Sequence, residues 1–125
     1  ISLKSASDYK SAEPLALNAA NYLLTTPFKE KDSDRERAFS FLLRWTAGDK
    51  DYHFEITGRI LDVMDEKELM SLVIPAMVKF CLENKALGSS PSIIEKNAIQ
   101  IVLNYCDNPA NNFTLKKKLR RKLEN

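Results

Sequence analysis

His53 is the only histidine in the 125-residue chain, so any catalysis by an imidazole would have to use this side chain. No Gly-x-Ser-x-Gly turn, cysteine–histidine motif or zinc-protease helix accompanies it. The three glycines stand apart, at positions 48, 58 and 88, and therefore cannot build a loop that binds phosphate. The sequence favours a protein that is not an enzyme, with no catalytic residue and no cofactor assigned.

Acidic residues alternate with other residues around this histidine, in the run Asp49, Asp51, His53 and Glu55. In a loop, such side chains could converge on a cation. The run lacks the turn glycine and the distant bidentate glutamate of a calcium-binding loop. The sequence therefore predicts no metal site here, and Asp49 or Asp51 is expected to cap a helix instead.

Aromatic residues concentrate between positions 39 and 54. Packing in the hydrophobic core is the favoured explanation, because aromatic side chains contribute strongly to core stability. The alternative is a pocket near Trp45, Tyr52 and His53 that binds a small ligand or performs catalysis. The five aromatic residues are Phe39, Phe41, Trp45, Tyr52 and Phe54.

Residues 113–125 hold six Lys or Arg and one acid, a charge of +5, whereas the remainder holds 13 basic and 16 acidic groups. A basic amphipathic helix can bind nucleic-acid phosphates, an anionic surface or an acidic protein groove. No aromatic residue is interleaved among the charges to stack on bases. The favoured alternative is a helix that docks through Leu115, Leu119 and Leu123 and leaves its charges in solvent. The candidate polyanion-binding residues are Lys116, Lys117, Lys118, Arg120, Arg121 and Lys122.

Cys81 and Cys106 are 25 residues apart, a spacing that matches no metal-ligand motif. Both lie among apolar neighbours in predicted helices, where buried thiols are common. We expect them to be inert, with a disulfide between the two helices as the alternative.

Hydrophobic periodicity and capping residues predict six helices and no paired strand. The fold is therefore expected to be all-α, a single compact bundle of five to six helices. The segment of about 66–85 is so apolar that it should lie at the centre, surrounded by the others. Asp65 and Glu68 form a capping-box-like pattern at its start. The predicted helices cover about 12–26, 33–48, a start between 49 and 52 to 64, then 66–85, 91–107 and 111–123, the last being the basic C-terminal helix.

The length and the composition, with 44% hydrophobic and 29% charged residues, fit one soluble domain. Residues 1–125 are expected to form this helical domain, with 1–10 as a poorly ordered N-terminal lead. The most apolar run, 69–82, is shorter than the ~20 residues that span a bilayer, so no transmembrane segment is predicted. The first residue is Ile1 and not Met, which fits an exported protein after signal removal or a chain trimmed upstream. The sequence therefore assigns no cellular compartment.

Three functions of different class follow from these observations. The leading hypothesis is a non-enzymatic module that acts through a protein partner or through self-association, with the apolar segment of about 66–85 as the contact surface. The second is binding of a polyanion, nucleic acid or an anionic surface, through the basic C-terminal helix. The third is a small-ligand binder or enzyme that uses the pocket near Trp45, Tyr52 and His53.

Overall fold

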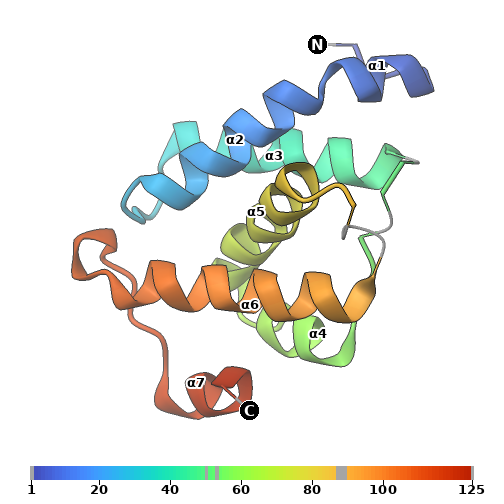
Figure 1. Ribbon diagram of the computed structural model, residues 1–125. Coiled ribbons are helices and arrows are strands. Elements are labelled where there is room, and N and C mark those ends of the chain that lie inside the picture. The colour runs from blue at the N-terminus through green and yellow to red at the C-terminus, as the bar shows by residue number, and fades with distance from the viewer. Residues whose placement is uncertain (1, 50, 53, 87–89, 125) are drawn as a thin grey trace.

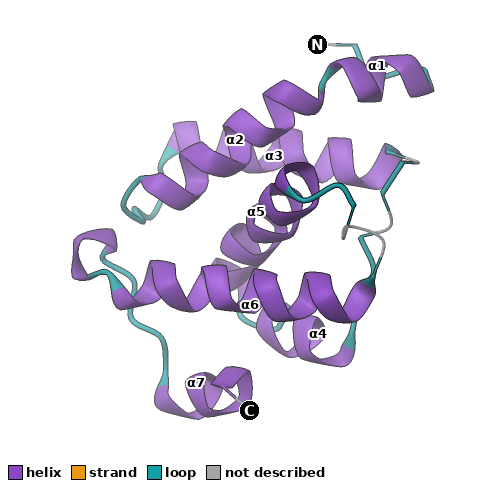
Figure 2. Ribbon diagram, viewed as in Figure 1, coloured by secondary structure: helices purple, strands orange, loops and turns teal. Residues whose placement is uncertain are grey.

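The computed structural model describes residues 2–49, 51–52, 54–86 and 90–124. In this part of the chain every regular element is a helix and no strand occurs, which confirms the all-α prediction (Figure 1, Figure 2). None of the described helices is long and apolar enough to cross a membrane. The elements are α1 (Ala6–Ser11), α2 (Glu13–Thr25), α3 (Ser33–Gly48), α4 (Gly58–Met64), α5 (Lys67–Glu83), α6 (Pro91–Asp107), the 3₁₀-helix η1 (Pro109–Asn111) and α7 (Lys117–Glu124).

Helix α5 packs against four other helices, α2, α3, α4 and α6. Figure 1 shows it crossing between the α2–α3 pair and the α4–α6 pair. Its sequence explains these contacts, because apolar residues occupy nearly every side of the helix between Leu69 and Leu82. Burial of this surface removes a large apolar area from water and stabilises the fold. The buried residues of α5 are Leu69, Leu72, Val73, Ile74, Pro75, Ala76, Met77, Val78, Phe80 and Cys81.

The helix predicted to start between positions 49 and 52 in fact starts at Gly58, so this predicted boundary is wrong. The hydroxyl of Thr57 caps α4 by accepting a hydrogen bond from an amide of its first turn. In the segment before it, the rings of Tyr52 and Phe54 pack against Trp45, with centroid distances of 6.4 and 5.8 Å. These contacts hold Tyr52 and Phe54 against α3, and the described residues of the segment, 51–52 and 54–57, are irregular although their apolar spacing also fits a helix.

The start of α5 also differs from the prediction. Asp65 was expected to cap this helix together with Glu68, but Asp65 instead ends α4. Glu66 occupies the N-cap of α5, and its side chain makes no capping hydrogen bond. The capping-box pattern is not used, because Asp65 has helical backbone angles, φ of −62° and ψ of −25°, whereas an N-cap residue has extended ones.

The N-terminal segment that was expected to be a poorly ordered lead contains α1. Ser5 caps this helix, since its hydroxyl accepts a hydrogen bond from the Asp8 amide and its own amide donates to the Asp8 carboxylate. The indole nitrogen of Trp45 donates to the carbonyl oxygen of Tyr9 at 2.9 Å and so ties α1 to α3. A Cβ atom at Gly48 would lie 2.0 Å from the Tyr9 hydroxyl, so the glycine leaves the space that this ring occupies. Helix α1 buries none of its residues, which is why no apolar periodicity predicts it.

Helix α7 begins at Lys117, six residues after the predicted start at 111. The chain leaves α6 through η1, and Asn112 then adopts a left-handed conformation with φ of 55°. The three leucines of the predicted stripe are buried, and Arg59 of α4 donates a hydrogen bond to the carbonyl oxygen of the last one, Leu123. Helix α7 thus packs through its leucines and leaves most of its basic side chains exposed.

Candidate functional site

The loop between α2 and α3 is fixed by the end of α6 and by the residues that follow it. The hydroxyl of Tyr105 donates a hydrogen bond to the carbonyl oxygen of Thr26 at 2.7 Å. The amide of Phe28 donates to the carbonyl oxygen of Asn111 at 2.8 Å. The ring of Phe28 also meets Phe113 edge to face, with 5.1 Å between the centroids. These contacts join two parts of the chain that are far apart in sequence.

The first turn of α3 places Arg35 beside this loop, with only 5% of the residue exposed. Its Nη1 donates to the carbonyl and hydroxyl oxygens of Thr26, at 3.2 and 2.9 Å. Its guanidinium carbon lies 5.8 Å from the centroid of the Phe28 ring. Its Nη2 is buried and has no hydrogen-bond partner among the described residues, and none of them forms an ion pair with Arg35.

A pocket of about 360 Å³ lies beside Arg35, between the α2–α3 loop, α3 and the first turns of α5. Buried and half-buried apolar side chains line its base: Leu23, Phe28, Phe39 and Met70. Charged side chains of both signs, most of them exposed, line the remainder: Lys29, Glu30, Lys31, Asp32, Glu36, Lys67 and Glu68. The pocket therefore combines an apolar base with a charged rim.

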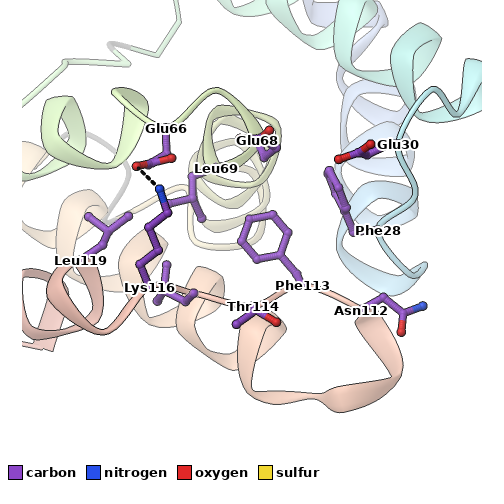
Figure 3. A pocket seen from close by; sticks show the side chains of 11 residues that line it. Phe28, Glu30, Glu66, Glu68, Leu69, Asn112, Phe113, Thr114, Lys116 and Leu119 are labelled. Carbon is purple, nitrogen blue, oxygen red and sulfur yellow. Dashed lines mark ion pairs between the residues drawn. The ribbon is translucent and has the colours of Figure 1, made fainter.

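A second pocket, of about 370 Å³, adjoins the first and shares Phe28, Glu30 and Glu68 with it. Figure 3 shows Phe113 projecting into this pocket toward α5, with Glu30 and Glu68 extending from the loop and from α5. We call the two adjoining pockets the Phe28 groove. Its walls are the end of α2, the α2–α3 loop, the first turns of α3 and α5 with Glu66 before α5, residues 112–116 and Leu119 of α7.

No pattern in the sequence indicates the Phe28 groove. By sequence, residues 29–34 are a polar loop, and Arg35 is one of several charged residues at the start of a helix. One local signal marks Arg35 itself. A cation in the first turn of a helix opposes the helix dipole, so a contact outside the helix is expected to stabilise it there. The contacts that bury Arg35 come from residues far along the chain, which local patterns do not reveal.

The structure brings the six predicted polyanion-binding residues together on α7 and the residue before it. Lys116 lies 3.5 Å from the Glu66 carboxylate, as the dashed line in Figure 3 marks, and Arg120 lies 2.7 Å from Asp107. Acidic side chains thus neutralise part of the basic surface, and its binding to a polyanion stays a prediction. The four candidates that are exposed and form no ion pair with a described residue are Lys117, Lys118, Arg121 and Lys122.

The predicted ligand-pocket residues Trp45 and Tyr52 lie side by side, whereas His53 is outside the described residues. Trp45 has no exposed surface and packs in the core against both Tyr52 and Phe54, whose rings also contact each other. Neither Trp45 nor Tyr52 lines either pocket of the Phe28 groove. In the described part of the chain, these two aromatic residues therefore serve the core, and a ligand pocket at this place stays a prediction.

Asp49, at the end of α3, is a carboxylate with only 9% of the residue exposed. Its Oδ2 is buried and has no hydrogen-bond partner among the described residues. Burial raises the pKa of Asp49, and the negative charges of Asp51 and Glu13 add to this rise, although hydrogen bonds from the backbone of Asp51 and Tyr52 oppose it. No group of three or more metal-ligating side chains occurs in the part of the chain that the structure describes.

Asp49→Asn is expected to raise the free energy of unfolding near pH 7 and to change it little at about pH 3. The folded pKa of Asp49 is raised, so its contribution to stability is complete below the unfolded value, ~3.9, and is lost as the pH rises through the folded value. Asparagine cannot ionise, so the variant does not lose this contribution to stability as the pH rises. Urea unfolding at several pH values measures the gain, and the exposed Asp51→Asn serves as control with a smaller effect. A gain that persists unchanged on acidification would contradict this explanation.

The two cysteines, Cys81 and Cys106, are buried and are not bonded to each other. Burial raises the pKa of the Cys81 thiol to about 11. Burial likewise raises the pKa of the Cys106 thiol to about 11. Since the thiolate is the reactive form, both side chains are poor nucleophiles near neutral pH.

The apolar surface of α5, predicted as a contact for self-association, is used inside the fold. Its apolar residues are buried or half-buried against the neighbouring helices. The large apolar side chains that are exposed in the described part of the chain lie on different elements: Leu15 on α2, Leu43 on α3, Ile56 before α4 and Leu61 on α4.

The chain matches no protein-family model, no curated protein and no solved structure. Its function therefore has to be inferred from the contacts, burial and charges of its own residues.

Proposed function

We propose that this chain is a non-enzymatic interaction module that binds an apolar segment of a protein partner in the Phe28 groove. The observation that carries this proposal is the composition of the groove, with apolar side chains at its base and exposed charges of both signs around them. An apolar centre with a polar rim is the usual anatomy of a protein–protein interface. The high pKa of both buried thiols argues against one class of enzyme, that with a cysteine nucleophile.

In this proposal α5 is the centre of the bundle and provides a rigid wall of the groove. Its buried residues anchor the helix, while Lys67, Glu68, Met70 and Ser71 at its start line the binding surface. The backbone of a packed helix is already ordered, so it loses little conformational freedom when a partner binds. The groove is therefore suited to bind a segment of a partner without a large rearrangement.

The exposed cations of α7 favour a second candidate function, which is binding to a polyanion such as nucleic acid. Lys117, Lys118, Arg121 and Lys122 lie close together on one short helix, and they form no ion pair with a described residue. Binding through these side chains would release counterions and weaken steeply as salt increases. Binding of an apolar segment in the Phe28 groove would depend much less on salt, and this difference separates the two candidates.

Selection from a library of random peptides with free carboxyl ends tests the proposed function. We expect the protein to select peptides that bind wild type and bind Met70→Glu at least about ten-fold more weakly, because a buried charge opposes an apolar ligand. Leu61→Glu is the matched control, since it introduces the same charge at a residue that is 55% exposed on α4. This control should bind like wild type.

Ser71→Trp provides a second groove variant, which fills the space without adding a charge. Circular dichroism and urea unfolding verify that each variant is folded before affinities are compared. The proposal is wrong if the library yields no binder, or if both groove variants bind the selected peptides as tightly as wild type. If binding of the selected peptides weakens as salt increases and is lost in Lys117→Glu/Arg121→Glu, the function would be assigned to α7 instead.

A further inference from the structure

Arg35 is a buried positive charge without a counterion among the described residues. Its Nη1 donates to Thr26, its charge also interacts with the hydroxyl of Tyr105, and its Nη2 has no hydrogen-bond partner among the described residues, while only 5% of the residue is exposed. Burial of a charge is costly unless the charge is paired, and buried charges in folded proteins are therefore usually paired with an opposite charge. The neutral oxygens of Thr26 and the face of the Phe28 ring stabilise the guanidinium only in part.

The acidic side chains around the pocket do not supply the missing charge. Asp32 is the closest in sequence, but its Oδ1 accepts hydrogen bonds from the amides of Asp34 and Arg35 and so caps α3. The remaining acids of the pocket, Glu30, Glu36 and Glu68, are exposed, and none forms an ion pair with Arg35. Three lysines, Lys29, Lys31 and Lys67, also line the pocket. They offset most of the acidic charge, so a negatively charged ligand is not strongly repelled there.

We infer that the partner segment of the proposed function carries a carboxylate that pairs with Arg35 while its apolar side chains fill the base of the pocket. This inference rests on the proposed function and names the chemistry that the groove recognises. Arg35 lines the same pocket as Leu23, Phe39 and Met70, and its buried Nη2 has no hydrogen-bond partner among the described residues. A carboxylate next to apolar groups satisfies both features at once, since charge-assisted hydrogen bonds to arginine are strong where water is excluded.

The groove favours a protein segment over a free fatty acid as the source of this carboxylate. The pocket beside Arg35 adjoins the pocket around Phe113, with which it shares Phe28, Glu30 and Glu68, and charged side chains of both signs line the two. A polypeptide can pair its own polar groups with such a rim, whereas an alkyl chain leaves those groups without partners.

N-acetyl-L-leucine and N-acetyl-L-leucinamide form a matched pair of probes, because they differ in the carboxylate and share the apolar side chain. Binding is measured by amide chemical shifts of the isotope-labelled protein, with octanoate as a third probe. We expect the acid to bind wild type about ten-fold more tightly than the amide. In Arg35→Met this preference for the acid should disappear, and Arg35→Lys should retain only part of it, since one ammonium nitrogen replaces the two terminal nitrogens of the guanidinium, Nη1 and Nη2.

Arg37→Met is the matched control, because Arg37 lies two residues further along α3 and its side chain is 78% exposed. It should keep the full preference for the acid. The inference is overturned if wild type binds acid and amide equally, if the preference survives in Arg35→Met, or if octanoate binds through Arg35 far more tightly than N-acetyl-L-leucine. Selected peptides that still require Met70 but show no carboxylate preference would overturn this inference and leave the proposed function intact.

Discussion

Replacing Trp45 by alanine is expected to lower the free energy of unfolding by about 3–5 kcal/mol, the range for removing a large buried aromatic side chain. Trp45 has no exposed surface, and its ring contacts both Tyr52 and Phe54. Its indole nitrogen also donates a hydrogen bond to the carbonyl oxygen of Tyr9. The substitution therefore removes a contact between α1 and α3 as well as packing in the core. A domain of this size has roughly 5–15 kcal/mol of stability in total, so a large part of it would be lost. Urea unfolding followed by circular dichroism measures the change.

Trp45→Phe separates the ring from its hydrogen bond. This variant keeps most of the aromatic volume and removes only the donor to Tyr9, whose carbonyl oxygen still accepts the amide of Ala12. We expect a cost of about 1–2 kcal/mol, the contribution of one hydrogen bond together with a small packing defect. If Trp45→Ala cost less than about 1 kcal/mol, Trp45 would not be the buried residue described above and a pocket at this place would regain support.

The second large effect is expected for Leu72→Ala, at about 2–5 kcal/mol. Leu72 is fully buried on α5, where four neighbouring helices pack, so the cavity left by the substitution has little opportunity to collapse. Leu61→Ala is the matched control, because it deletes the same atoms from a leucine that is 55% exposed. We expect the control to change the free energy of unfolding by no more than about 0.5 kcal/mol. Equal effects of the two substitutions, measured by urea unfolding, would contradict the packing of α5.

Helices whose ends are marked by local residues could be predicted from the sequence. The predicted helix over 33–48 agrees with α3, because Asp32 caps its start and Gly48 lies at its end. The predicted helix over 91–107 agrees with α6, where Pro91 occupies the first helical position. In both cases the signals lie within a few residues of the boundary, so no tertiary contact is needed to place it.

Elements that depend on distant contacts could not be predicted. The residues before Gly58 carry a helical spacing of apolar side chains, yet those that the structure describes, 51–52 and 54–57, are irregular, with Tyr52 and Phe54 packed on Trp45. Helix α1 has a capping pattern but buries none of its residues, so periodicity does not reveal it. Local signals predict an element only where tertiary packing agrees with them.

The candidate site depends even more on contacts between residues that are distant in sequence. The basic residues of α7 were identified from composition, because charges that are adjacent in sequence remain adjacent on a helix. The Phe28 groove is built from the α2–α3 loop, α5 and residues 112–116, which meet only in the folded chain. Tyr105 and Asn111 fix the loop that encloses Arg35, and neither carries a signature of that role.

Chemical-shift mapping of a library-selected peptide on the isotope-labelled protein tests the proposed interaction most directly. The predicted result is that the largest amide shifts fall in the α2–α3 loop, in the first turns of α3 and α5 and in residues 112–116, the walls of the Phe28 groove. Leu119 of α7 also lines the groove, so its shift separates no hypotheses. Shifts concentrated on the exposed basic residues Lys117, Lys118, Arg121 and Lys122, or around Trp45 and Tyr52, would contradict the proposal and would favour polyanion binding or a ligand pocket in its place.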